Sequence, residues 1–263
     1  MAADPRAPRT LSPGLPLSQW IECLWIQDGY VRPHARERVL PAATLDLVFV
    51  LDANGRAASG VSGPRSEYSL LETSQPFSAI GVHFRPGGGR RFFGVPVGEL
   101  HNRSVPLDAV WGRAAGAVSD RLWETDSIDR RFRVLEEALG RRAGDRAAPP
   151  PAVSFALDAI ARAHGGRSIR EIVDRIGMSP RRFSDVFRDH VGLSPKLFAR
   201  LTRFTAALAQ MERAADVDLA DAALSCGYFD QAHFNHDFRA FSGLTPSTYV
   251  RRRTSRTHVA ETG

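Results

Sequence analysis

Two stretches in the C-terminal half decide the fold: Ser168–Pro195, SIREIVDRIGMSPRRFSDVFRDHVGLSP, and Val217–Pro246, VDLADAALSCGYFDQAHFNHDFRAFSGLTP. They are two copies of one unit, and an internal repeat identifies an architecture better than any single motif does. The apolar positions and the glycine of the first copy recur 50 residues later in the second copy. After one inserted residue, matching positions lie 51 residues apart, up to the endings GLSP and GLTP. The chain therefore contains a tandem repeat.

Each copy is predicted to be a helix, a glycine turn and a second helix. Glycine permits the positive φ that a tight corner between helices needs, and Ser179-Pro180 or Asp230 then begins the second helix. Phenylalanines four residues apart are expected to anchor one face of each second helix in the core; they are Phe183, Phe187, Phe234 and Phe238. This is the pattern of a helix-turn-helix unit.

The outward faces of the second helices carry side chains that suit DNA bases and phosphates. Helical bundles that bind no DNA also contain such corners and polar faces, so one copy alone would not distinguish a DNA-binding unit from an ordinary helical bundle. Two copies in register with matched endings favour the DNA-binding unit.

The repeat resembles the tandem helix-turn-helix domain of the AraC-type (AraC/XylS family) transcription regulators over about 100 residues, with RIGMSPRRFSDVFRDHVGLSP as one half and CGYFDQAHFNHDFRAFSGLTPSTYVRRR as the other. The resemblance implies that a long helix, here Pro195 to Met211, joins the two units. Their recognition helices would then enter successive major grooves on one face of the DNA.

By position in the motif, the resemblance implies two sets of contacts. The expected base-facing residues are Arg181, Ser184, Asp185, Gln231, His233 and His236. The expected phosphate contacts are Arg182, Arg188, Asn235 and Arg239. The family often has arginine at the positions of Asp185 and His236; Asp185 could accept a hydrogen bond from cytosine N4 or be repelled by the backbone. The two histidines could also be solvated surface residues or a metal pair, but no third ligand lies near them in sequence.

The region before the repeat reads as short β segments, WIECLWIQ, LDLVFVL and FSAIGVHF, separated by glycine, proline and asparagine. Two helical stretches, Leu107–Leu122 and Ser127–Leu139, follow it. The expected fold class is α+β multidomain, with a small β-barrel or sandwich-like domain followed by an all-α tandem helix-turn-helix domain.

The expected division of the chain has six parts. They are a flexible Pro-rich arm (1–18), a β-rich sensor domain (19–106), a helical packing or dimerisation segment (107–140), a linker (141–151), the tandem helix-turn-helix domain (152–253) and a disordered tail (254–263).

The charge distribution and the positions of the cysteines are compatible with a DNA-binding regulator but do not by themselves indicate one. The chain has 35 basic and 29 acidic residues, with 19 and 17 of them up to Pro150 and 16 and 12 after it, so the C-terminal part is the more basic. The cysteines Cys23 and Cys226 form no zinc or disulfide pattern. The longest apolar stretch, Leu45–Leu51, contains Asp46, so no signal or membrane span is expected. A cytoplasmic location is the expectation.

The β-rich region occupies the place where AraC-type regulators commonly carry an effector-binding or dimerising domain. Its candidate effector-binding residues are Trp25, Asp46, His83 and Arg85, for each of which ordinary packing is the alternative role. The RPGGGR run fits neither phosphate-binding motif and is expected to be a turn.

The sequence therefore predicts a sequence-specific DNA-binding transcription factor that responds to an effector through its N-terminal domain. One alternative is a regulator whose N-terminal domain only dimerises or binds protein, and a second is a DNA-linked enzyme. No catalytic motif, metal site or cofactor is expected, so the chain is read as a non-enzyme. Expected partners are double-stranded operator DNA, and beyond it RNA polymerase, a small-molecule effector and a second copy of the chain, but no membrane.

Overall fold

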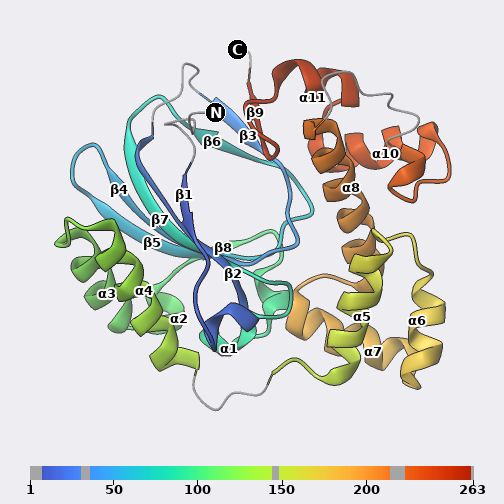
Figure 1. The fold of residues 1–263 in the computed structure, drawn as a ribbon, viewed down its shortest axis with the longest axis horizontal. Coiled ribbons are helices and arrows are strands. Elements are labelled where there is room, and N and C mark those ends of the chain that lie inside the picture. The colour runs from blue at the N-terminus through green and yellow to red at the C-terminus, as the bar shows by residue number, and fades with distance from the viewer. Residues whose placement is uncertain (1–7, 31–35, 144–147, 214–222, 262–263) are drawn as a thin grey trace.

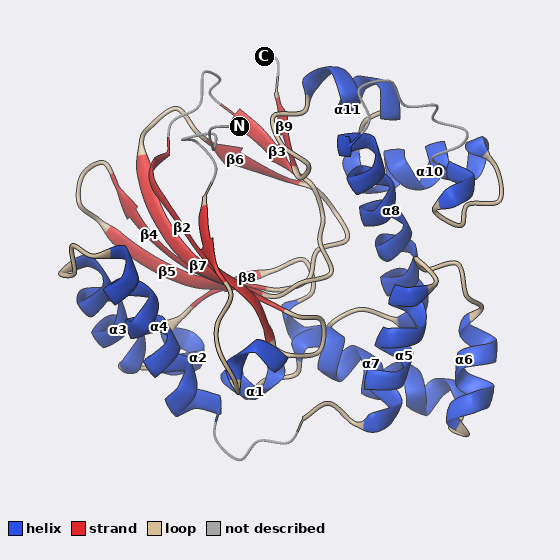
Figure 2. Ribbon diagram, viewed as in Figure 1, coloured by secondary structure: helices blue, strands red, loops and turns tan. Residues whose placement is uncertain are grey.

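The computed structural model describes residues 8–30, 36–143, 148–213 and 223–261. It contains an N-terminal β-rich domain and a C-terminal helical domain that lie side by side (Figures 1 and 2). The strands are β1 (Arg9–Leu11), β2 (Ile21–Tyr30), β3 (Arg36–Val39), β4 (Asp46–Asp52), β5 (Ala57–Ser62), β6 (Ser69–Glu72), β7 (Phe77–Phe84), β8 (Ser104–Pro106) and β9 (His258–Ala260).

Two antiparallel sheets form the N-terminal domain. The larger sheet has the order β1-β2-β7-β4-β5-β8, and the smaller has the order β6-β3-β9. Both sheets are open in the described part of the chain, so of the two expected forms, barrel or sandwich-like, the barrel is wrong, whereas the antiparallel β-rich domain is confirmed. Sequence periodicity shows which residues form strands, but closure depends on pairing between edge strands, which periodicity does not report.

Helices cover one face of the larger sheet (Figure 2). They are η1 (Leu17–Gln19), α1 (Arg90–Phe93), η2 (Val97–Leu100), α2 (Asp108–Trp111), α3 (Ala114–Trp123) and α4 (Ile128–Ala143). The first predicted helix is broken at Gly112, whose φ of 59° ends α2. Alternate sheet residues such as Leu47, Phe49 and Val82 are fully buried against these helices. This segment therefore serves as a packing layer.

The C-terminal domain is helical, as predicted. Its helices are α5 (Pro151–Arg162), α6 (Ile169–Ile176), α7 (Pro180–Val191), α8 (Pro195–Arg213), α10 (Gln231–Ser242) and α11 (Pro246–Arg252). Much of the first helix expected in the second copy of the repeat lies outside the described residues, which resume at residue 223. The core of this domain also includes Leu40, next to β3, and Val259 of β9.

Both chain ends differ from the expected division. In the arm, β1 pairs with β2 and η1 follows, so residues 9–19 are ordered. In the tail, β9 pairs with β3, so residues 258–260 form a strand rather than a disordered segment. The sequence does not indicate these strands, because each is only three residues long and is held by pairing with a distant partner.

Candidate nucleic-acid interface

The first helix-turn-helix unit consists of α6 and α7. Helix α6 ends at Gly177, whose φ of 71° lies in the left-handed region that glycine tolerates best. The Ser179 hydroxyl then accepts a hydrogen bond from the Arg182 backbone N–H at 3.4 Å, and Pro180 occupies the first helical position. These caps are the ones that the sequence predicts.

The second unit repeats the same design at its recognition helix. The Asp230 carboxylate accepts a hydrogen bond from the His233 backbone N–H at 2.7 Å and begins α10. Helix α10 ends at Gly243, where φ is 69°, and α7 ends at the equivalent Gly192, where φ is 90°. The two recognition helices therefore begin and end alike.

The paired phenylalanines form the inner face of each recognition helix, as predicted. All four rings are at most 1% exposed, and each pair contacts the joining helix α8. Phe187 packs edge-on against Phe198 with ring centroids 5.6 Å apart, and Phe238 packs edge-on against Phe204 at 5.2 Å. Helix α8 is thus the common support of both units.

The residues expected to contact DNA lie mainly on the outer faces. In α7, Arg181, Arg182, Asp185 and Arg188 are exposed and Ser184 is half-buried. In α10, Gln231, Asn235, His236 and Arg239 are exposed and His233 is half-buried. Each helix therefore presents a polar, arginine-containing surface of the kind that binds phosphates and base edges.

A groove of about 220 Å³ runs between α10 and α11. Its lining residues are Gln231, Asn235, Arg239, Thr245, Pro246 and Ser247. Sequence reasoning missed Thr245 and Ser247 as members of this surface, although the GLTP ending marks their position. Hydroxyls beside an arginine suit a phosphate oxygen, since both donate hydrogen bonds.

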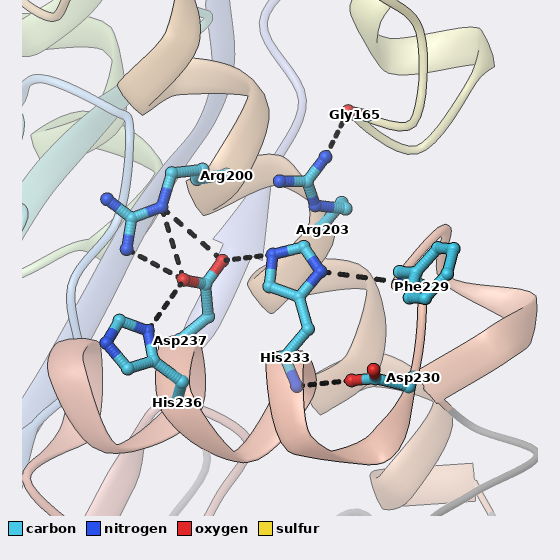
Figure 3. A network of polar contacts seen from close by, with 8 residues as sticks. All are labelled: Gly165, Arg200, Arg203, Phe229, Asp230, His233, His236 and Asp237. Atoms are coloured by element: carbon cyan, nitrogen blue, oxygen red, sulfur yellow. Dashed lines mark hydrogen bonds and ion pairs between the residues drawn. The ribbon is translucent and has the colours of Figure 1, made fainter.

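The inner side of α10 carries an ion pair between a buried carboxylate and a half-buried arginine that the sequence did not reveal (Figure 3). Asp237 is 2% exposed and accepts hydrogen bonds from Arg200 of α8, from Nη2 to Oδ1 at 2.7 Å and from Nε at 3.2 Å. His233 turns toward the same carboxylate, with Nε2 3.9 Å from Oδ2. Its other ring nitrogen, Nδ1, accepts from the Phe229 N–H at 3.5 Å. The predicted base reader His233 is therefore engaged in contacts within its own unit.

Three of the four candidate effector-binding residues meet on one face of the larger sheet. His83 of β7 pairs through Nδ1 with the Asp46 carboxylate of β4. The Trp25 ring of β2 stacks on the His83 ring with centroids 5.8 Å apart. The ring lies across Gly81, where an added Cβ would come within 2.6 Å of it. Arg85 instead donates to the Ser18 carbonyl at 3.0 Å.

The electrostatics of this face depend on the His83–Asp46 pair. Burial lowers the pKa of His83, but the hydrogen bond and negative charge of Asp46 raise it, and the net direction is upward. The Trp25 Nε1 is buried and has no hydrogen-bond partner in the described part of the chain. This face therefore carries a hydrogen-bonded imidazole–carboxylate pair beside an aromatic ring whose N–H has no partner among the described residues.

Two features are absent from the part of the chain that the structure describes. No group of three histidine, cysteine or acidic side chains there is placed to hold a metal ion. None of the described helices has the length and apolar character needed to cross a membrane.

Residues 172–252 match the helix-turn-helix domain family, and residues 9–106 match a domain of unknown function (DUF6597). The HTH-type transcriptional regulator Rv1931c of Mycobacterium tuberculosis is 36% identical over 88 residues, which make up 34% of this chain and 34% of that protein. The chain thus aligns with about a third of this curated relative.

Two solved structures also align with this chain. An apo variant of ToxT from Vibrio cholerae has a TM-score of 0.45 at 9% identity, over 87% of this chain and 97% of that one. The C-terminal domain of AraT, a response regulator from Geobacillus stearothermophilus, has a TM-score of 0.38 at 20% identity, over 41% and 91%.

Proposed function

We propose that this chain is a sequence-specific DNA-binding regulator of transcription initiation of the AraC type, acting through its C-terminal helix-turn-helix domain. The observation that carries the proposal is the repeated unit itself. Two recognition helices with matched caps stand on one joining helix, and both turn polar faces outward. Known members of the family are DNA-binding regulators, which supports the reading of this chain as a non-enzyme.

In this proposal Arg181, Ser184 and Asp185 read bases for the first unit, and Gln231 and His236 read them for the second. Arg182, Arg188, Asn235 and Arg239 bind phosphates, together with the hydroxyls of Thr245 and Ser247. Arginine suits the phosphate role because its fork of N–H donors stays charged and matches paired oxygens.

Selection of bound DNA from a randomised library tests this proposal. Purified full-length protein should select two short conserved blocks whose centres lie about 10 base pairs apart, since each recognition helix enters its own major groove. Binding without sequence preference would contradict base reading, and selection of a single block would contradict the use of both units.

We further propose that an effector acts through the N-terminal domain, because this domain contacts the C-terminal end of both recognition helices. At α7, a Cβ added to Gly192 would come within 2.8 Å of Pro64 and 2.9 Å of Val97. The Arg90 guanidinium also binds the Asp189 carboxylate at 2.9 Å and the His190 Nε2 at 3.0 Å.

At α10, the contact is made by β3. Arg38 donates through Nη1 to the Ser242 carbonyl at 2.7 Å and lies 3.8 Å above the Tyr68 ring, and both side chains border Gly243. The strand β9, which follows the C-terminal domain in the chain, pairs with β3 and so joins the two domains. A shift in the N-terminal domain would therefore be transmitted to both recognition helices.

The effector site that we propose is the face formed by Trp25, Asp46 and His83. A melting-shift screen of small polar metabolites tests it, with DNA affinity as the second readout. A ligand that stabilises the wild type but not Asp46→Asn, and that changes DNA affinity, would support the proposal. Ligand-independent dimerisation with no such response would instead support an N-terminal domain that only assembles. We also propose that the protein dimerises, contacts RNA polymerase and acts in the cytoplasm.

A further inference from the structure

Asp237 is buried on the inner face of a helix that is proposed to read DNA. An aspartate is seldom fully buried unless it is paired, and here the partner is Arg200 of α8 (Figure 3). The Arg200 guanidinium also lies 5.2 Å from the centre of the Phe241 ring, one turn further along α10. A single arginine of the joining helix thus contacts two successive turns of the recognition helix.

The repeat shows that this arrangement is peculiar to the second unit. At the offset of 51 that relates the recognition helices, Asp237 corresponds to Val186 of α7. Val186 packs against the core as a partly buried apolar residue. Burying an ion pair adds little net stability, because desolvation of both charges offsets their attraction. Its directional hydrogen bonds, in contrast, fix the relative orientation of the groups that make them.

The Asp237 carboxylate also lies beside two residues of the proposed reading surface. The His236 Nδ1 is 3.7 Å from Oδ1, and the His233 Nε2 is 3.9 Å from Oδ2. The His236 side chain is 78% exposed, whereas that of His233 is 39% exposed and packs edge-on against the Tyr228 ring. The Asp237 carboxylate therefore lies close to α8 through Arg200 and to the outward side of α10 through His233 and His236.

We propose that Asp237 is a positioning residue for DNA recognition: paired with Arg200, it fixes the rotation of α10 on α8 and so directs His236 and its neighbours at the groove. Asp237 itself does not touch DNA. His233 belongs to this internal network rather than to the set of base readers. The inference rests on the proposed function, since it concerns the second half of the DNA site.

The test uses the full-length chain and three variants. Asp237→Asn removes the charge, and Arg200→Leu with Asp237→Val replaces the ion pair by apolar residues, as at Val186. Such a replacement often leaves stability unchanged, so the double variant remains informative if the single one is unstable. Val186→Ala is the matched control at the equivalent position of the first unit.

The readout is the preference for the selected DNA over DNA in which one block is scrambled. Both Asp237 variants should lose about tenfold in preference at the second block, the size of one base contact. Their preference at the first block should stay within about twofold, because distant sites act independently. Val186→Ala should not change the second-block preference. A double variant with wild-type preference at both blocks would overturn the proposal, and so would equal losses at both.

Amide hydrogen exchange without DNA separates this inference from the proposed function. Asp237→Asn should speed exchange of the α10 amides about tenfold and leave those of α7 unchanged, because loss of one anchor opens one helix locally. Unchanged exchange in α10 would refute the anchoring role. If the wild type selects no two-block site, the proposed function is wrong, and the exchange measurement still decides whether Asp237 anchors α10.

Discussion

Individual side chains on the two recognition helices divide into those that hold the fold and those that face outward. The four phenylalanines were predictable because the 3.6-residue period of a helix places residues four apart on one face. Asp237 was not predictable, because an aspartate amid polar neighbours reads as surface until its partner on another helix is known. The same holds for His233, whose ring is turned toward a contact 3.9 Å away.

Arg181 provides the sharpest test of base reading in the first unit. Arg181→Ala should weaken binding by about 1–3 kcal/mol at one preferred base and relax the preference there, because a bidentate contact to guanine is lost. Arg182→Ala, which removes an expected phosphate contact, should weaken binding equally on all sequences. Titration of both variants against cognate and scrambled DNA measures the difference; an equal loss for Arg181→Ala on both would make it a phosphate contact.

Phe238 is fully buried between the recognition helix and α8. Phe238→Ala should lower the free energy of unfolding by about 3–5 kcal/mol, since it loses burial and leaves a cavity. Phe229→Ala is the matched control, because Phe229 is 87% exposed, and it should change stability little. Urea denaturation compares the two, and a small effect at Phe238 would mean that the core face has been misassigned.

The contact between His190 of α7 and Arg90 of the N-terminal domain is expected to depend on pH. Burial, followed by the positive charge of Arg90, lowers the pKa of His190, so the folded state favours the neutral ring that accepts from Arg90. A lowered pKa contributes stability above the ordinary value of about 6.5, and this contribution is lost as the pH falls through the folded pKa. Unfolding of the wild type and His190→Gln from about pH 7.5 to about pH 5 should show a smaller loss in the variant. Parallel curves would contradict this assignment.

At the scale of elements, the strongly periodic segments were the predictable ones. The helices α6 and α7 lie where the first copy of the repeat predicts a helix, a glycine turn and a second helix, because each has a strong apolar face and ends at a glycine. Short elements such as β1 and β9 were missed, since three residues carry no readable period. Their existence depends on partners that lie far away in the chain.

The strand β9 should contribute measurably to stability because Val259 is fully buried in the C-terminal core. Val259→Ala should lower the free energy of unfolding by about 2 kcal/mol through lost apolar burial. It should also speed amide exchange in β3, the strand with which β9 pairs. Removal of residues 262–263 is the control and should have neither effect. Wild-type exchange in β3 would show that β9 does not hold it.

At the scale of the whole molecule, the structure adds a connection that sequence could not supply. The two domains could be separated in the sequence because their patterns change from alternating to helical, with prolines between them. Their mutual contact could not be predicted, because it joins residues as distant as Arg38 and Ser242. The candidate DNA surface was therefore largely found from the repeat, whereas the coupling to the N-terminal domain required the structure.

The central claim is that two recognition helices, held on one joining helix, read two successive grooves at once. The most direct test compares the affinity of the full-length chain for its selected site and for the same site with about five base pairs inserted between the blocks, which rotates them by half a turn. We expect the affinity to fall to that for a site whose second block is scrambled, about tenfold or more, because the fixed units cannot follow the second block. Undiminished affinity for the rotated site would contradict the claim.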